Sequence, residues 1–185
     1  MKKLALTLTA LFAFAACAFA QKTPTVVVVN METVLNGYYK TTESRQRLQG
    51  AAETSQKELN DQLTSLRDLE GKIQEKNESL NNPALTDEGR KKIQEDAQPL
   101  ITEYQTKRQA FEASQRRVQS ELQSQSNSIN ATLVKDITEK AIAIAKEKNA
   151  DMVLTTGITG VLWADSAYDI SQLVIDALNA GQPKN

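Results

Sequence analysis

The chain has 185 residues, with 22 basic and 23 acidic side chains, a single cysteine and no histidine. The near balance of charge argues against a nucleic-acid-binding protein, which would need a concentrated basic face. Without histidine, the commonest general base and the commonest metal ligand are both missing. The length is that of one domain of ordinary size.

Residues 1–20 have the layout of a secretory signal peptide. Lys2 and Lys3 precede an apolar run that ends at Cys17, and an A-x-A cleavage site follows at residues 18–20. The run is too short for a permanent membrane span, which needs about 20 apolar residues. We therefore expect the mature chain to be soluble and exported, with a net charge of about −3.

Cys17 leaves a second interpretation open, in which the cysteine is lipidated and anchors the protein to a membrane. Phe14 stands where such a lipidation signal normally has leucine, and the cleavage site after it is good, so we favour cleavage. The mature protein then contains no cysteine and forms no disulfide.

Residues 21–40 are predicted to supply the N-terminal part of a small β body. The four consecutive valines at 26–29 predict a strand that is buried on both faces. A short apolar helix is expected from there to Tyr39. The strand has no candidate partner among the next hundred residues, which are polar and helical.

Residues 41–149 are predicted to form a helical hairpin arm. Apolar residues recur every seven positions in two runs, which is the pattern of a coiled coil. The break at Asn81-Asn82-Pro83 and the acidic start at Asp87 place the tip near residues 81–90. The first run is Ala52, Leu59, Leu66, Ile73 and Leu80, and the second is Ala97, Tyr104, Phe111 and Val118.

The apolar positions of the two runs mirror each other about residue 85. Leu59 is thereby matched with Phe111, and Leu66 with Tyr104, as expected for an antiparallel pair of helices. Each arm of about 45 residues would extend for roughly 65 Å.

Gly71 and Pro99 fall at the same level of the predicted arm. They are the two residues least suited to a helix interior, because glycine costs about 1 kcal/mol relative to alanine and proline removes a hydrogen bond. They are interpreted either as a tolerated irregularity or as a hinge partway along the arm.

Residues 150–185 are predicted to complete the β body with two strands and a final helix. The strands are expected at Met152–Thr156 and Val161–Ala164, joined by a loop with Gly157 and Gly160, and Asp169 should cap the helix. These strands are the candidate partners of the valine strand. The fold class is therefore α+β, with a long coiled-coil hairpin projecting from a small body that both ends of the chain build.

A catalytic constellation is not evident in the sequence. The pair Gly157 and Gly160 lies between predicted strands and lacks the lysine and helix of a phosphate-binding loop. Acidic pairs such as Asp87-Glu88 lie at helix starts, where the helix dipole explains them. We expect neither an enzyme nor a bound metal, cofactor or nucleotide.

The order of these segments resembles the Skp/OmpH family of periplasmic chaperones. The resemblance is carried by the strand that ends Val-Val-Asn-Met at residue 31, the charged hairpin, and three later segments. These segments are Asp151-Met-Val-Leu, Val161-Leu-Trp-Ala-Asp165 and Tyr168-Asp-Ile-Ser171.

The resemblance implies a jellyfish-shaped homotrimer that works without ATP. Three arms would enclose a cavity that holds unfolded outer-membrane proteins and prevents their aggregation. Many members have strongly basic arms, whereas the basic residues near this tip, such as Lys72 and Arg90, are matched by acidic ones, such as Glu70 and Glu88. The resemblance therefore does not carry over charge attraction to clients, or peripheral contact with anionic membranes, to this protein.

The small sheet also argues for assembly. Three short strands leave open edges, and one helix can cover only one face of the valine strand, so several chains should share one body. The residues that contact the client cannot be named. The runner-up function is a structural coiled-coil spacer or adaptor of the envelope, and an enzyme comes third. The residues expected in the shared body are Val26, Val28, Met152, Leu154, Leu162 and Trp163.

Overall fold

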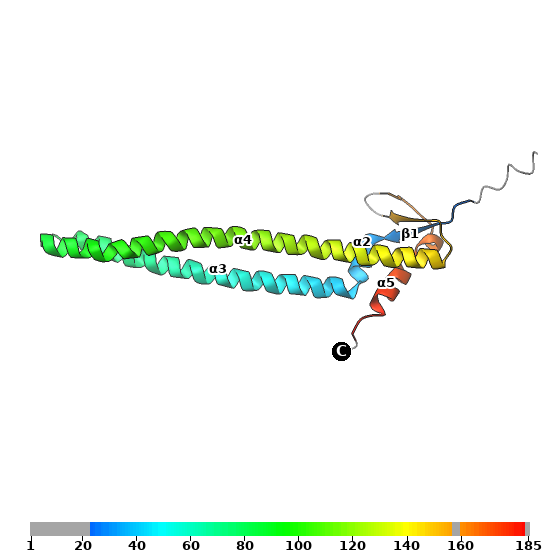
Figure 1. Cartoon of the computed structure of the whole chain (residues 1–185), viewed down its shortest axis with the longest axis horizontal. Coiled ribbons are helices and arrows are strands. Elements are labelled where there is room, and N and C mark those ends of the chain that lie inside the picture. Colours follow the sequence, from blue (N-terminus) through cyan, green and yellow to red (C-terminus); the bar gives the residue numbers. More distant parts are fainter. Residues whose placement is uncertain (1–22, 157–159, 184–185) are drawn as a thin grey trace, which may run out of the picture. The chain divides into compact units, whose positions relative to one another are not determined.

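The computed structural model describes residues 23–156 and 160–183, which form helices and a two-stranded sheet (Figure 1). The described residues form two compact units. One is the helical unit Tyr39–Val134, and the other, the terminal unit, joins the residues up to Tyr38 with those from Lys135 on. The predicted signal peptide at residues 1–20, with Cys17, lies outside the described residues, as do residues 157–159 of the glycine loop.

The helical unit is an antiparallel hairpin, as predicted. Helix α3 spans Tyr39–Leu80, and helix α4, which spans Asp87–Glu147, continues into the terminal unit (Figure 1). The Lys76 ammonium lies 3.2 Å from the Asp96 carboxylate, and the Lys107 ammonium donates to the Ser65 hydroxyl at 2.9 Å. The numbers of these partners add to about 170, so the predicted mirror register is reproduced to within about one residue on each helix.

The seam between the helices is thin. Leu66, Leu69 and Ala97 are buried, whereas Leu59 and Phe111, like most of the other heptad residues, are only half-buried. Two helices cover each seam residue from one side only, so most of the predicted heptad residues keep part of their surface in water. The hairpin therefore has a stripe of contacts instead of a deep core.

Hydrogen bonds close the tip. The Asn82 carboxamide oxygen accepts from the Ala84 amide, and the Thr86 hydroxyl accepts from the Gly89 amide at the start of α4. The Arg90 guanidinium donates to the Leu80 carbonyl at 2.8 Å, which satisfies one of the carbonyls that the end of α3 leaves without a helical donor.

The terminal unit contains a parallel pair of strands. Strand β1 spans Val26–Asn30 and strand β2 spans Met152–Thr156, with Val26 opposite Met152 and Val28 opposite Leu154. The Asp151 carboxylate accepts from the Thr25 amide at 2.8 Å where the strands begin. The valine strand thus pairs with a strand about 120 residues later in the sequence, as predicted.

Short helices pack against strand β1 of the sheet. Helix α2 spans Met31–Gly37, the 3₁₀ helix η2 spans Ser166–Tyr168, and α5 spans Ser171–Asn179. The Asn30 side chain caps α2 through the Thr33 amide. The Asp169 carboxylate, predicted to cap α5, accepts from the Ser171 amide, but the N-cap residue of α5 is Ile170.

The core of the terminal unit already covers both faces of β1. Val27, Val28 and Val29 are exposed by 6%, 4% and 1%. The expectation that one chain cannot cover both faces is therefore wrong. The prediction considered only the final helix as cover, whereas α2 and the last turns of α4 also belong to this unit. Helices α2, α4 and α5 contribute the buried residues Val34, Ile137, Ala141, Ile144, Ala145, Val174 and Ile175.

The predicted strand Val161–Ala164 is also wrong. Only Val161 pairs with β2, through an isolated bridge to Thr156. Asp169 bridges to Val28 of β1 instead, so the chain must cross from one strand to the other between these two residues. The crossing leaves too little chain to extend along β2, and the Asp165 carboxylate helps to turn it by accepting from the Ala167 amide.

Candidate interaction surfaces

The side chains of β2 form an exposed apolar surface on the terminal unit. Met152 is 46% exposed and Leu154 is 36% exposed, although both point from a strand whose neighbour β1 is buried. Across the register, Val26 is half-buried and Val28 is buried. The structure therefore divides the six residues predicted for a shared body, because Val28 belongs to the core of the single chain and the β2 side chains do not.

The segment after the glycine loop exposes more apolar surface. Leu162 is fully exposed and Trp163 is 79% exposed, and Tyr168, at the end of η2, is 52% exposed. Single exposed apolar residues are common, but a large contiguous apolar surface usually marks an interaction site. We define Met152, Leu154, Leu162, Trp163 and Tyr168 as the exposed apolar set.

Sequence reasoning found four members of this set from their apolar character but did not single out Tyr168. Asp165 and Asp169 predict turns, so the short segment between them is not expected to be a strand. An aromatic ring in such a segment was the signal that could have identified Tyr168 as exposed.

The outer edge of β2 is open over most of its length. Within residues 23–156 and 160–183, the sheet has only the two strands β1 and β2, and Val161 occupies one position on the β2 side. An edge strand with unpaired backbone groups and apolar side chains is a template for pairing with another chain. The open edge belongs to β2, and the exposed apolar set lies on β2 and on the segment that follows it.

The surface of the hairpin is charged but balanced. Along α4, basic side chains pair with acidic ones four residues away, as in Arg108 with Glu112 and Arg117 with Glu121. Such exposed pairs contribute only about 0.2–1 kcal/mol each, so they have little effect on stability. Because basic and acidic side chains alternate in these pairs, the electrostatic potential along this helix is mixed in sign.

Gly71 and Pro99 lie in the interiors of α3 and α4, and both helices continue through these positions. One contact between the helices, Lys76 with Asp96, lies on the tip side of Gly71 and Pro99, and another, Lys107 with Ser65, lies on the other side. Gly71 and Pro99 therefore occur at similar levels of the hairpin. A methyl group added at Gly71 would meet nothing within 4 Å. The hinge itself stays a prediction.

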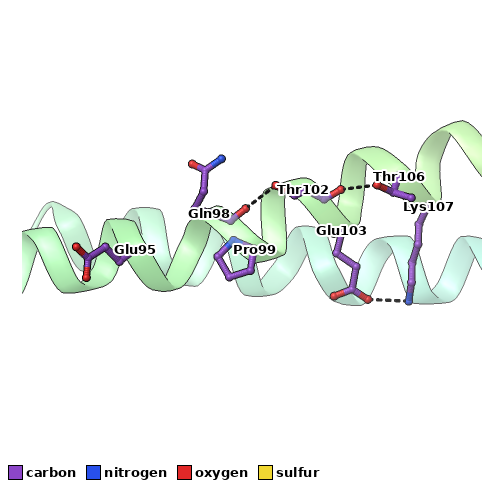
Figure 2. A pocket seen from close by; sticks show the side chains of 7 residues that line it. All are labelled: Glu95, Gln98, Pro99, Thr102, Glu103, Thr106 and Lys107. Carbon is purple, nitrogen blue, oxygen red and sulfur yellow. Dashed lines mark hydrogen bonds and ion pairs between the residues drawn. The ribbon is translucent and has the colours of Figure 1, made fainter.

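A groove with a volume of about 830 Å³ lies along one side of α4 at Pro99 (Figure 2). The Thr102 hydroxyl donates to the Gln98 carbonyl, and the Thr106 hydroxyl donates to the Thr102 carbonyl. Lys107 forms an ion pair with Glu103 at 3.1 Å. The groove therefore presents a proline ring and threonine methyl groups, with its polar atoms largely engaged. Its lining is Glu95, Gln98, Pro99, Thr102, Glu103, Thr106 and Lys107.

In residues 23–156 and 160–183, histidine, cysteine and carboxylate side chains do not gather in a group of three or more that could hold a metal ion. Over the same ranges, each helix is too short or too polar to span a bilayer.

These units define a helical-hairpin protein in which both ends of the chain build a small parallel sheet. The model of a family described as outer membrane protein (OmpH-like) matches residues 25–178. The chain therefore belongs to the OmpH-like family, which confirms the resemblance found in the sequence.

A solved structure has the same fold. It is that of a candidate outer membrane chaperone (OmpH-like) from Caulobacter crescentus, with a TM-score of 0.69, 15% sequence identity and coverage of 87% of each chain. At this identity the likeness establishes the fold alone. None of the curated proteins matches the chain.

Proposed function

We propose that this protein is an ATP-independent periplasmic chaperone that binds unfolded outer-membrane proteins and prevents their aggregation. The observation that carries the proposal is the family match over residues 25–178, which spans both the sheet and the hairpin. Export through the signal peptide at residues 1–20 is part of the proposal. So is action by binding alone, without catalysis, a cofactor or a nucleotide.

The active form that we propose is a homotrimer joined through the terminal units. The open edge of β2 and the exposed apolar set support this, because pairing β2 with another chain would cover both Leu154 and the backbone groups at the edge. Leu162 and Trp163 would be covered in the same assembly. The number of chains is the one that the family resemblance implies.

The client would be held by many weak contacts along the hairpins. A client without fixed structure cannot be matched by a preformed pocket, so affinity must come from several contacts that act together. The half-buried seam residues, such as Leu59 and Phe111, offer apolar surface at intervals along both helices. The balanced charge of α4 implies that apolar contact matters more here than attraction between opposite charges.

The test is an aggregation assay with the mature protein and an unfolded outer-membrane protein diluted from denaturant. We expect suppression of light scattering at near-stoichiometric ratios of trimer to client, without ATP and with little dependence on salt. The control client is a denatured water-soluble protein of the same size. If aggregation proceeds unchanged although the protein is folded and assembled, the chaperone proposal fails, and the structural spacer of the envelope becomes the better description.

A further inference from the structure

A cavity that opens to solvent, with both polar and apolar side chains in its lining, lies between the two helices of the hairpin, away from the tip. It has a volume of about 330 Å³ and receives side chains from the first turns of α3 and from residues 128–133 of α4. Two of the lining residues are cations and three carry hydroxyl groups, and none is acidic. The lining is Lys40, Ser44, Arg47, Ser128, Ile129, Thr132 and Leu133.

The hydrogen bonds of the cavity leave donors in excess. Ser44 is only 6% exposed, and its hydroxyl oxygen accepts a long bond of 3.4 Å from the Arg47 guanidinium. Among the described residues, the proton of this buried hydroxyl has no acceptor of its own. A buried donor without an acceptor is costly, so the site favours a ligand that supplies one.

The remaining groups point to the same kind of ligand. The Thr132 hydroxyl already donates to the Ser128 carbonyl, whereas the exposed Ser128 hydroxyl lines the cavity as a second donor. Arg47 has five N–H donors and, within the part of the chain that the structure describes, forms no ion pair.

The position on α3 adds to this preference. Helix α3 has no acidic residue in its first turn, where an acidic side chain would normally complement the positive end of the helix dipole. Arg47 also differs from Arg108 and Arg117, whose charges are paired with glutamates four residues away. The cavity thus combines a guanidinium with hydroxyl donors from both helices.

We propose that this cavity binds a small oxyanion of the phosphate type, held by Arg47, Ser44 and Ser128. A guanidinium and neighbouring hydroxyls match the acceptor oxygens of a tetrahedral oxyanion. Because Ser44 and Ser128 belong to different helices, the ion would bridge α3 and α4 and stabilise the hairpin. The proposal is independent of the chaperone function, since it concerns a ligand of the folded chain without a client.

Inorganic phosphate is the first probe, used with the full mature protein at constant ionic strength. We expect saturable binding by calorimetry and a rise in the melting temperature that chloride does not reproduce. Arg47→Gln should weaken binding about tenfold or more, because it removes a charge-assisted hydrogen bond. Ser128→Ala should weaken binding severalfold without any change in charge.

The matched control is Arg67→Gln, which removes an exposed arginine of α3 that does not line the cavity. Binding should be unchanged in this variant. Equal binding in the Arg47→Gln and Arg67→Gln variants, or no effect of Ser128→Ala, would show general attraction to a cationic surface and overturn the proposal. So would the absence of saturable binding in the wild-type protein.

A second arm of the experiment distinguishes free phosphate from a lipid headgroup. Vesicles of phosphatidylglycerol and of phosphatidylcholine are tested for cosedimentation with the same variants. Cosedimentation with either vesicle that is lost in Arg47→Gln and retained in Arg67→Gln would assign the bound phosphate to a lipid. Binding of inorganic phosphate without cosedimentation would assign it to the free ion.

Discussion

Gly37, the last residue of α2, illustrates how a single small residue sets the packing of the terminal unit. A Cβ atom at this position would lie 2.8 Å from Cδ1 and 3.1 Å from Cγ1 and Cγ2 of Ile175 on α5. The Gly37 carbonyl also accepts from the Asn179 side chain of α5 at 2.8 Å. The two short helices can approach this closely because residue 37 has no side chain.

We therefore expect Gly37→Ala to destabilise the protein by about 1–3 kcal/mol through overpacking, measured by urea unfolding. The control is Gly50→Ala in α3, where a methyl group would meet nothing within 4 Å. This control should stabilise the helix by about 1 kcal/mol, because alanine has the higher helix propensity. An unchanged free energy of unfolding in Gly37→Ala would mean that the Ile175 side chain moves aside at no cost.

Thr41 carries a buried polar atom with no partner. Its side chain lies in α3 and is 5% exposed, and its hydroxyl makes no hydrogen bond. Valine has nearly the same shape and the same β-branch, so Thr41→Val removes the desolvation cost without opening a cavity. We expect the free energy of unfolding to rise by about 1 kcal/mol.

Thr54→Val is the matched control for Thr41→Val. Thr54 is exposed on the same helix, and its hydroxyl donates to the Gly50 carbonyl at 2.9 Å. The control should change the free energy of unfolding by less than about 0.5 kcal/mol, as is usual at the surface. Loss of stability in Thr41→Val would indicate that the buried hydroxyl has an acceptor after all.

At the scale of the element, the register of the hairpin can be tested by crosslinking. Cysteines replacing Leu66 and Tyr104, or Leu59 and Phe111, should form a disulfide within one chain, because facing seam positions lie close enough for the bond. The crosslinked chain is detected by its mobility on a denaturing gel without reductant. The control pair, cysteines replacing Leu59 and Leu122, should not crosslink within the chain. If only the control pair crosslinks, the register is wrong.

The hinge at Gly71 and Pro99 is a second prediction for this element. Replacing both by alanine should straighten and stiffen the hairpin, because alanine restores the missing helical hydrogen bond and the higher helix propensity. We expect a higher melting temperature and, in the aggregation assay, a narrower range of client sizes. The double variant Gly50→Ala with Thr54→Ala is the control for helix propensity alone. Unchanged small-angle scattering and client range would favour a tolerated irregularity.

Local pattern was enough to predict the hairpin, but not the terminal unit. The heptads and the break after Leu80 are local signals, and the pairing of β1 with β2 followed from the lack of any other partner for four valines. The strand predicted at Val161–Ala164 does not form because a contact later in the chain decides the path of this segment. Asp169 bridges to Val28 of β1, so the residues before it must leave β2. A preference for extended structure at Val161 carries no information about that contact.

The cavity at Arg47 was missed for a related reason. Serine and arginine on a polar helix usually form a solvated face, and the sequence does not reveal that Ser44 is buried against the other helix. The exposed apolar set was easier to anticipate because apolar residues in short terminal segments need cover of some kind. What the sequence could not decide was which of them the single chain covers by itself.

At the scale of the whole molecule, the core of the terminal unit changes what disruption of assembly should do. Val28 is 4% exposed within one chain, so Val28→Asp should unfold the terminal unit whether or not chains associate. Leu162 and Trp163 lie outside that core. Substitutions at these positions should therefore separate assembly from folding.

We expect the double variant Leu162→Ser and Trp163→Ser to remain folded but to dissociate into monomers at micromolar concentration. Aromatic residues such as Trp163 are common anchors of an interface, and serine at both positions removes apolar area without adding charge. Sedimentation velocity measures the association, and circular dichroism checks the fold. The control is Leu173→Ser on α5, which is 43% exposed and lies outside the exposed apolar set. This variant should assemble like the wild type.

Leu154→Lys tests the contribution of the β2 edge to the same assembly. A lysine on an edge strand opposes pairing with another strand, because its ammonium would have to leave water. In the single chain Leu154 is already 36% exposed, so the substitution should cost the isolated terminal unit little. We expect a folded monomer that no longer suppresses client aggregation, since the single hairpin of one chain cannot surround a client. A wild-type protein that sediments as a compact monomer would contradict the trimer, and a Leu154→Lys variant that still assembles would place the interface away from β2.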